Sequence, residues 1–176
     1  MKIRAAPLEG AFRIELARIE DARGFFARSF CKRELLEAGV SFECVQCNVS
    51  GNRRKGTVRG MHFQIAPRAE AKIVRCTRGA AYDVIVDLRP GSPTHGQWYG
   101  EELTADNHVA LFVPEGFAHG FETLEDDTEI LYMMSEPYSP EHARGVRWND
   151  PRFAIRFPLP VAEISERDAG FPDYTP

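Results

Sequence analysis

Two histidines stand out among the side chains that can move a proton near neutral pH, since only histidine has an unperturbed pKa in that range. His62 lies in a segment where strand alternation places Gly60, His62 and Gln64 on one face. His119 ends the segment Pro114-Glu115-Gly116-Phe117-Ala118-His119. Three other histidines follow turn residues and are expected to be solvated: His95, His108 and His142. His62 and His119 are therefore the candidates for proton transfer or metal binding.

The P-x-G-x-x-H spacing that ends at His119 resembles the second sequence motif of the cupin superfamily. Cupin metal sites take two more histidines and a glutamate from a first motif, which here has His62 and Gln64, with Glu70 beyond. Loss of one imidazole ligand weakens a first-row metal site. We therefore expect a cupin barrel with no metal and no cofactor. Two alternatives stay open: a metal-dependent cupin enzyme that uses His62, Glu70 and His119, and a His119 that is only a buried, hydrogen-bonded core residue.

A series of motifs resembles the dTDP-4-dehydrorhamnose 3,5-epimerase family, in the family's order and over nearly the whole chain. The motifs are Arg23 to Phe26, Gln46 to Ser50, Val58 to Gln64, Lys72 to Cys76, Asp83 to Arg89, Pro114 to Phe121 and Trp148 to Pro151. The resemblance implies a cupin jelly-roll barrel and a homodimer that shares N-terminal strands. It also implies a nucleotide-linked 4-keto-6-deoxyhexose as substrate.

The chemistry of such a substrate explains why a base is needed. The C4 ketone acidifies the hydrogens at C3 and C5, so a general base can remove one and leave an enolate. By the resemblance, His62 is this base, and Asp168 is the carboxylate that fixes its tautomer and stabilises the imidazolium. Without the resemblance, Asp168 is better interpreted as a solvated loop residue.

The enolate and the returning proton need two further groups. By the resemblance, Lys72 stabilises the enolate oxygen; on its strand it alternates with apolar Val74 and Cys76, so either its ammonium has a partner or the side chain extends to solvent. Inversion returns the proton from the opposite face, and Tyr132 is the acid by family position. A core tyrosine bonded to backbone is the alternative for Tyr132.

The remaining family positions imply contacts with the nucleotide, diphosphate and sugar. An arginine guanidinium suits pyrophosphate geometry, although a surface salt bridge explains either arginine taken alone. The expected substrate-binding residues are Arg23, Phe26, Gln46, Asn48, Arg59, His119 and Tyr138.

Several positions depart from the commonest family pattern: Arg28, Cys47, Val49 and Met133. These departures leave open a different nucleotide or 4-keto sugar, and epimerisation at C3 alone. A metal-free cupin that binds a sugar nucleotide without converting it is an alternative of another class. The set of His62, Lys72, Tyr132 and Asp168 argues against it, because binding alone needs no base and acid on opposite faces.

Composition sets the frame for these assignments. The chain has 176 residues, 43% of them hydrophobic, which suits a single domain over residues 1–176. Its 22 Lys and Arg residues against 26 Asp and Glu residues give a net charge of −4, so we expect no nucleic-acid partner. No apolar run has the ~18 residues of a membrane span, and the N-terminus lacks a signal-peptide pattern, so we expect a cytoplasmic protein.

Period-two alternation dominates the chain and predicts an all-β barrel of many short strands, with short peripheral helices. Strands are expected near residues 12–16, 42–46, 72–76, 82–88, 110–113, 122–124 and 129–134. One helix is expected over 31–38, ended by Gly39. Cys44 and Cys47 form a single C-x-x-C, for which plain packing is favoured over zinc or redox chemistry. From Pro137 on, loops are expected to wrap the barrel and to end in a loose tail over 171–176.

Overall fold

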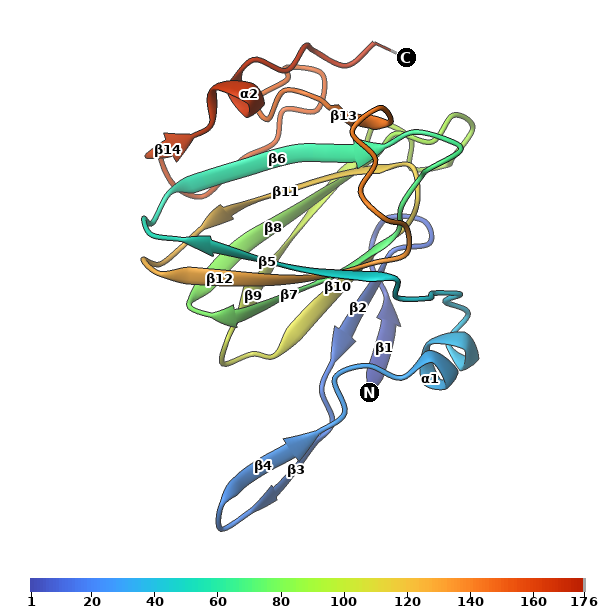
Figure 1. Ribbon diagram of the computed structural model, residues 1–176, viewed down its shortest axis with the longest axis vertical. Coiled ribbons are helices and arrows are strands. Elements are labelled where there is room, and N and C mark those ends of the chain that lie inside the picture. The colour runs from blue at the N-terminus through green and yellow to red at the C-terminus, as the bar shows by residue number, and fades with distance from the viewer. Residues whose placement is uncertain (176) are drawn as a thin grey trace.

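The computed structural model describes residues 1–175, which form two facing β-sheets (Figure 1). The first sheet has the strand order β1 (Lys2–Ala5), β2 (Phe12–Glu15), β10 (Val109–Val113), β7 (Lys72–Arg78), β12 (Thr128–Met134), β5 (Gln46–Asn52). The second has the order β13 (Ala143–Gly145), β6 (Thr57–Gln64), β11 (Phe117–Thr123), β8 (Ala80–Asp87), β9 (Trp98–Thr104), and β14 (Glu163–Ile164) pairs with β6 in parallel. This architecture agrees with the predicted jelly-roll barrel.

The main core lies between the two sheets, where the inward side chains of both meet. Buried Phe117, Phe121 and Ile85 from the second sheet pack with Leu111 and Ile130 from the first. Full burial of such a side chain contributes roughly 1.5–3 kcal/mol, so this interface holds the sheets together.

Strand β8 is buried on both faces because the C-terminal quarter covers its outer side. Val84 and Val86 pack there against Val146 and Phe153. The predicted wrapping of the barrel is therefore confirmed. The loose tail is not observed: the Tyr174 amide donates to Asp150 at 2.5 Å, and its ring packs on Phe153. Pro176, the last residue of that predicted tail, lies outside the described residues.

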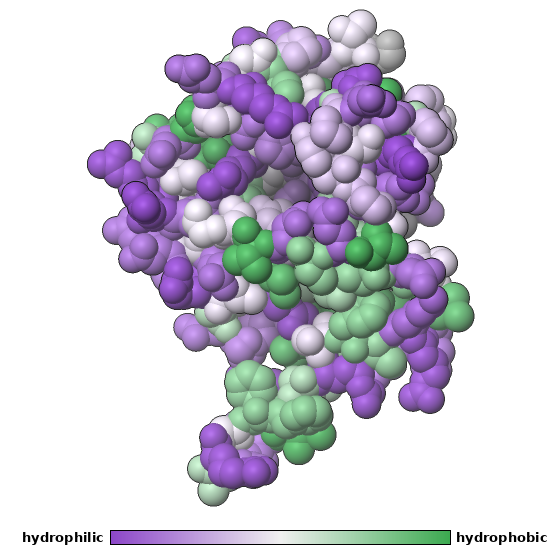
Figure 2. Space-filling model, viewed as in Figure 1, coloured by the Kyte–Doolittle hydropathy of each residue, from purple (hydrophilic) through white to green (hydrophobic). Residues whose placement is uncertain are grey.

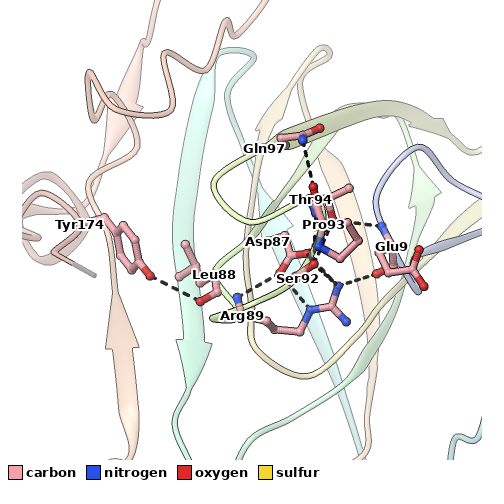
Figure 3. Close-up of polar contacts among 9 residues, drawn as sticks. All are labelled: Glu9, Asp87, Leu88, Arg89, Ser92, Pro93, Thr94, Gln97 and Tyr174. Carbon is pink, nitrogen blue, oxygen red and sulfur yellow. Dashed lines mark hydrogen bonds and ion pairs between the residues drawn. The ribbon is translucent and has the colours of Figure 1, made fainter.

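A polar network fixes the loop that follows β8 (Figure 3). Arg89 donates to both carboxylate oxygens of Asp87, and Ser92 and Thr94 donate to one of them. The Arg89 guanidinium also donates to the Glu9 carbonyl, which ties the loop to the N-terminal segment. Burial acts to raise the pKa of Asp87, but these hydrogen bonds outweigh it and hold the pKa well below its usual value.

Two short helices lie outside the sheets, and no helix among residues 1–175 is long and apolar enough to cross a membrane. Helix α1 (Lys32–Glu37) confirms the predicted helix, and Gly39 follows it with φ 86°. The Gly39 amide donates to Leu36 and the Val40 amide to Leu35, which is the Schellman pattern that glycine favours. Helix α2 (Glu166–Ala169) precedes the C-terminal tail.

Three details differ from the sequence expectations. Residues 42–45 form no strand, because Phe42 and Cys44 leave the sheet to pack in the cluster around α1. The strand expected over 122–124 is longer and begins at Phe117. The three histidines expected in solvent are half-buried beside aromatic or hydroxyl partners: His95 at Tyr174, His108 at Phe25 and His142 at Ser139.

Strands β3 (Arg18–Asp21) and β4 (Gly24–Ala27) form a hairpin that stands away from the barrel (Figure 1). Its large apolar side chains are exposed, Ile19 by 69% and Phe26 by 71%. Figure 2 shows this apolar surface on the hairpin, next to hydrophilic side chains. Monomeric proteins seldom expose such groups together without a binding role.

Candidate active site

A pocket of about 490 Å³ opens between the two sheets, within the size range of small-molecule sites. Strands of both sheets contribute to its wall. Its lining includes Gln46, Asn48, Val49, Ser50, Arg59, His62, Glu70, Lys72, His119, Tyr132, Tyr138, Arg144 and Arg167. It therefore collects most of the residues that the sequence singled out.

His62 and Asp168 form a hydrogen-bonded pair at this pocket. His62 Nε2 lies 2.8 Å from Asp168 Oδ1, and the Gly60 amide donates to Asp168 Oδ2 at 3.0 Å. Burial acts to raise the pKa of Asp168, but the bonds from His62 and Gly60 lower it below the usual value. The carboxylate is therefore ionised at neutral pH, as a partner of an imidazolium must be.

Local backbone features hold this pair in place. A Cβ at Gly60, where φ is 123°, would lie 2.5 Å from Gly120 Cα, so only glycine permits this approach of β6 to β11. Ser165 caps α2, and its hydroxyl accepts from the Asp168 amide at 3.1 Å. These contacts fix the Asp168 carboxylate beneath β6.

The C-terminal segment also positions the His62 ring. The Phe171 ring packs edge-on against it at 5.7 Å between centroids. A Cβ at Gly145 would come within 2.3 Å of the Phe171 ring, so glycine at this position makes room for that contact. The imidazole is thus held by a carboxylate at one atom and an aromatic edge beside it.

Lys72 is buried in the pocket wall and has the partner that its position on β7 requires. Its Nζ lies 2.9 Å from Glu70 Oε1 and donates to the His62 carbonyl at 3.3 Å. Both side chains are at least nine-tenths buried. A buried ammonium held this way can stabilise an oxyanion with little reorganisation.

Tyr132 enters the pocket from the sheet opposite His62, since it lies on β12 while His62 lies on β6. Burial, and then the Asp83 charge, raise the pKa of Tyr132 well above its usual value, so its hydroxyl stays protonated. Its ring packs edge-on against His119 at 6.0 Å. A ligand in the pocket would therefore meet an imidazole from one sheet and a phenol from the other.

His119 is buried and stands next to His62, its register partner across β6 and β11. Its Nε2 lies 2.7 Å from Asp83 Oδ1, so a carboxylate on β8 fixes its ring. The three residues of the metal-site alternative are each paired with another side chain: His62 with Asp168, Glu70 with Lys72 and His119 with Asp83. No group of three metal-ligating side chains occurs among residues 1–175.

Comparison with known proteins decides the family. The family model described as dTDP-4-dehydrorhamnose 3,5-epimerase matches residues 5–175. The chain belongs to this family. It is 47% identical over 153 residues to the dTDP-4-dehydrorhamnose 3,5-epimerase of Sinorhizobium fredii, which covers 86% of this chain and 78% of the relative. The predicted resemblance, and with it the assignment as an epimerase, is confirmed.

Solved structures of dTDP-4-dehydrorhamnose 3,5-epimerases share the fold throughout. The Bacillus anthracis enzyme, crystallised with TDP and PPi bound, has a TM-score of 0.95 and 44% identity, over 98% of this chain and 99% of that one. The Legionella pneumophila enzyme, in complex with dTDP-4-keto-L-rhamnose, has a TM-score of 0.91 and 35% identity, over 98% and 92% of the two chains. The predicted jelly-roll fold class is therefore confirmed.

The predicted binding residues of this epimerase fold fall into two groups. Gln46, Asn48, Arg59, His119 and Tyr138 lie at the pocket. Gln46 Nε2 donates to Asn48 Oδ1 at 3.2 Å, and Gln46 Oε1 accepts from the Tyr138 amide at 3.2 Å, so these three form one connected edge.

Arg23 and Phe26 form the second group, which the fold does not bring to the pocket of the same chain. Both lie on the β3–β4 hairpin, outside the pocket lining. The Arg23 side chain is 89% exposed and pairs only with its neighbour Asp21 among the described residues.

Sequence reasoning missed three side chains that position this epimerase site: Asp83, Phe171 and Glu70 as the partner of Lys72. Glu70 and Lys72 are two residues apart, a spacing that places them on one side of an extended chain, so this signal was present. Asp83 alternates with buried Ile85 on β8, and a charge there required a partner. Phe171 carried no signal, because it contacts His62 from a segment far away in the sequence.

Proposed function

We propose that the pocket binds a dTDP-linked 4-keto-6-deoxyhexose and inverts the carbons that flank its ketone, C3 and C5. The observation that carries this proposal is the placement around one cavity of His62, on one sheet and paired with Asp168 of α2, and of Tyr132 on the other sheet. Two findings support the substrate class. The Sinorhizobium fredii relative is a dTDP-4-dehydrorhamnose 3,5-epimerase, and the Legionella pneumophila structure holds dTDP-4-keto-L-rhamnose.

The reaction begins with proton removal by His62. The C–H bond next to the ketone breaks, its electron pair forms the C=C bond of an enolate, and the proton moves to the imidazole. Asp168, ionised and 2.8 Å from the ring, stabilises the imidazolium that results. The negative charge now lies on the O4 oxygen.

Lys72 stabilises this oxygen. Its ammonium is buried and pre-positioned by Glu70, so it acts in a site of low dielectric constant where a charge is effective. Tyr132 then gives its proton to the carbon from the opposite face, which completes the inversion. The His62 imidazolium releases its proton to solvent and the Tyr132 phenolate regains one from solvent, so both groups return to their starting states. The raised pKa of Tyr132 keeps this donor protonated between turnovers.

The diphosphate and nucleotide lie, in this proposal, along the pocket edge formed by Gln46, Asn48 and Tyr138, with Arg59 on the phosphates. Arg59 Nε donates to Asn52 Oδ1 at 2.7 Å, which leaves guanidinium donors for phosphate oxygens. His119, held by Asp83, is placed to donate a hydrogen bond to the sugar or its phosphate.

The protein acts as a homodimer in this proposal, and Arg23 and Phe26 complete the pocket of the partner subunit. The exposed hairpin supports this exchange, since burial of its apolar side chains and of the guanidinium needs a second surface. We also propose a cytoplasmic location, which agrees with four free cysteines among the described residues.

Incubation with several nucleotide-linked 4-keto-6-deoxyhexoses in deuterated water tests the proposed function. NMR should show deuterium at C3 and at C5 of the dTDP sugar, together with inverted product. Deuterium at C3 alone would restrict the reaction to that carbon. Absence of exchange with every sugar would contradict the proposed function.

A further inference from the structure

Cys44 and Cys47 lie together around the start of β5, Cys44 just before the strand and Cys47 on it, and side chains further along β5 line the pocket. Their sulfur atoms are 3.5 Å apart. Cys47 is exposed and Cys44 is half-buried, so small molecules in solvent can reach the pair. No third metal-ligating side chain joins the pair among residues 1–175, which favours thiol chemistry over metal binding.

The other two cysteines provide an internal contrast. Cys76 is buried, and its thiol donates to the carbonyls of Arg78 and Gly79. Cys31 is half-buried next to α1 and makes no sulfur–sulfur contact within residues 1–175. Of the four thiols, only Cys44 and Cys47 are therefore placed to react with each other.

We propose that Cys44 and Cys47 are a redox-sensitive modification site that forms an intramolecular disulfide with small disulfides such as glutathione disulfide. The Cys47 thiolate attacks one sulfur of glutathione disulfide, and one glutathione thiolate leaves. The Cys44 thiolate then attacks the Cys47 sulfur of the mixed disulfide and releases the second glutathione. Two protein thiols are oxidised, one glutathione disulfide is reduced to two thiols, and the two thiol protons pass to the departing thiolates.

Formation of the disulfide bond requires a small movement of the backbone around the pair. A disulfide bond is about 2.05 Å long, so the two sulfurs must approach by about 1.5 Å from their 3.5 Å separation. Cys47 is held in register with Met133 on β12. Cys44 lies in the irregular segment before β5, so closure moves Cys44 and the backbone that leads into Gln46.

Gln46 connects this movement to the pocket. Its side chain bonds to Asn48 and to the Tyr138 amide, and Cys44 Sγ lies 3.7 Å from its carbonyl oxygen. Displacement of Gln46 breaks at least one of these contacts at the edge where the nucleotide is proposed to bind. This second step rests on the proposed function, whereas disulfide formation does not.

Mass spectrometry of the full-length protein, incubated with glutathione disulfide in mildly alkaline buffer, tests the chemical step. We expect loss of two hydrogens per chain, a peptide in which Cys44 is linked to Cys47, and reversal by dithiothreitol. Cys31→Ser should behave like the unmodified chain, while Cys44→Ser should stop at the mixed disulfide on Cys47. A chain that keeps four free thiols, or a stable mixed disulfide in the unmodified chain, would overturn the proposal.

Calorimetric titration with dTDP tests the coupling to the pocket. The oxidised protein should bind dTDP roughly 3- to 10-fold more weakly than the reduced protein, as expected for the loss of one hydrogen bond. Cys47→Ser should bind equally before and after oxidant. Equal affinity of the reduced and disulfide forms would overturn the coupling, whereas failure of the reduced protein to bind dTDP would contradict the proposed function instead.

Discussion

At the scale of single residues, the candidate site consists of pairs in which one side chain lines the pocket and a carboxylate side chain is bonded to it. Asp168 holds His62, Asp83 holds His119 and Glu70 holds Lys72. Each holding residue is a buried carboxylate, which is costly without a partner and therefore fixes the geometry of the pair. Mutations can separate the roles of the acting residues.

His62→Asn should remove epimerisation and also the exchange of substrate hydrogen with solvent. General-base catalysis contributes about 10² to 10⁴ in rate, so both rates should fall by at least that factor. Deuterium incorporation measured by NMR checks this, with His95→Asn, outside the pocket lining, as the control. Exchange at the unmodified rate would mean that another residue is the base.

Tyr132→Phe should have a different effect, because abstraction by His62 does not need the phenol. Deuterium should still enter the substrate with retained configuration, while inverted product falls by about 10² to 10⁴. The comparison uses Tyr99→Phe, a tyrosine of the core outside the pocket lining. Loss of exchange equal to that of His62→Asn would contradict the role of Tyr132 as acid.

At the scale of elements, loops and short segments position the strands that carry the site. The network around Asp87 fixes the turn between β8 and β9, and β8 carries Asp83 beneath His119. The C-terminal segment places Asp168 and Phe171 against β6. The geometry of the site therefore depends on the rigidity of these connections.

Asp87→Asn should lower the free energy of unfolding by about 1.5–3 kcal/mol at pH 7, the contribution of hydrogen bonds to a charged group. The pKa of Asp87 is lower in the folded protein than in the unfolded chain, so its stabilisation is complete above about pH 4 and declines as the pH falls below that value. The deficit of the variant should therefore be smaller at pH 3 than at pH 7 in urea unfolding. Asp106→Asn, at an exposed turn, is the control, and a deficit independent of pH would contradict this account.

At the scale of the whole molecule, the barrel of one chain contains the proposed base, the proposed acid and the proposed oxyanion partner, but two predicted binding residues lie on a hairpin outside it. Arg23 and Phe26 cannot contact a ligand in their own pocket while the hairpin projects away from the barrel (Figure 1). Their function therefore depends on assembly of two chains, as proposed above.

Coexpression of Arg23→Ala and His62→Asn chains tests this exchange. If Arg23 serves the partner's pocket, a mixed dimer has one pocket with both defects and one intact pocket. Random pairing makes half of the dimers mixed, so about a quarter of the unmodified activity should return, although each variant alone is inactive or weak. Activity no higher than the average of the two variants, or light scattering that gives a 19.9 kDa monomer, would contradict the exchange.

The sequence alone determined the family and the all-β class and predicted the catalytic set, because ordered motifs, alternation and the chemistry of an enolate depend on residue type and local spacing. Alternation on β8 was correct as well, yet it could not say which face points inward. Tertiary structure decided that, because the C-terminal segment covers the outer face and leaves Asp83 on the side of the pocket. It also moved Phe42 and Cys44 out of the sheet and carried Arg23 away from Arg59. The physical reason is that partners such as His62 and Asp168, 106 residues apart, meet only when distant segments pack.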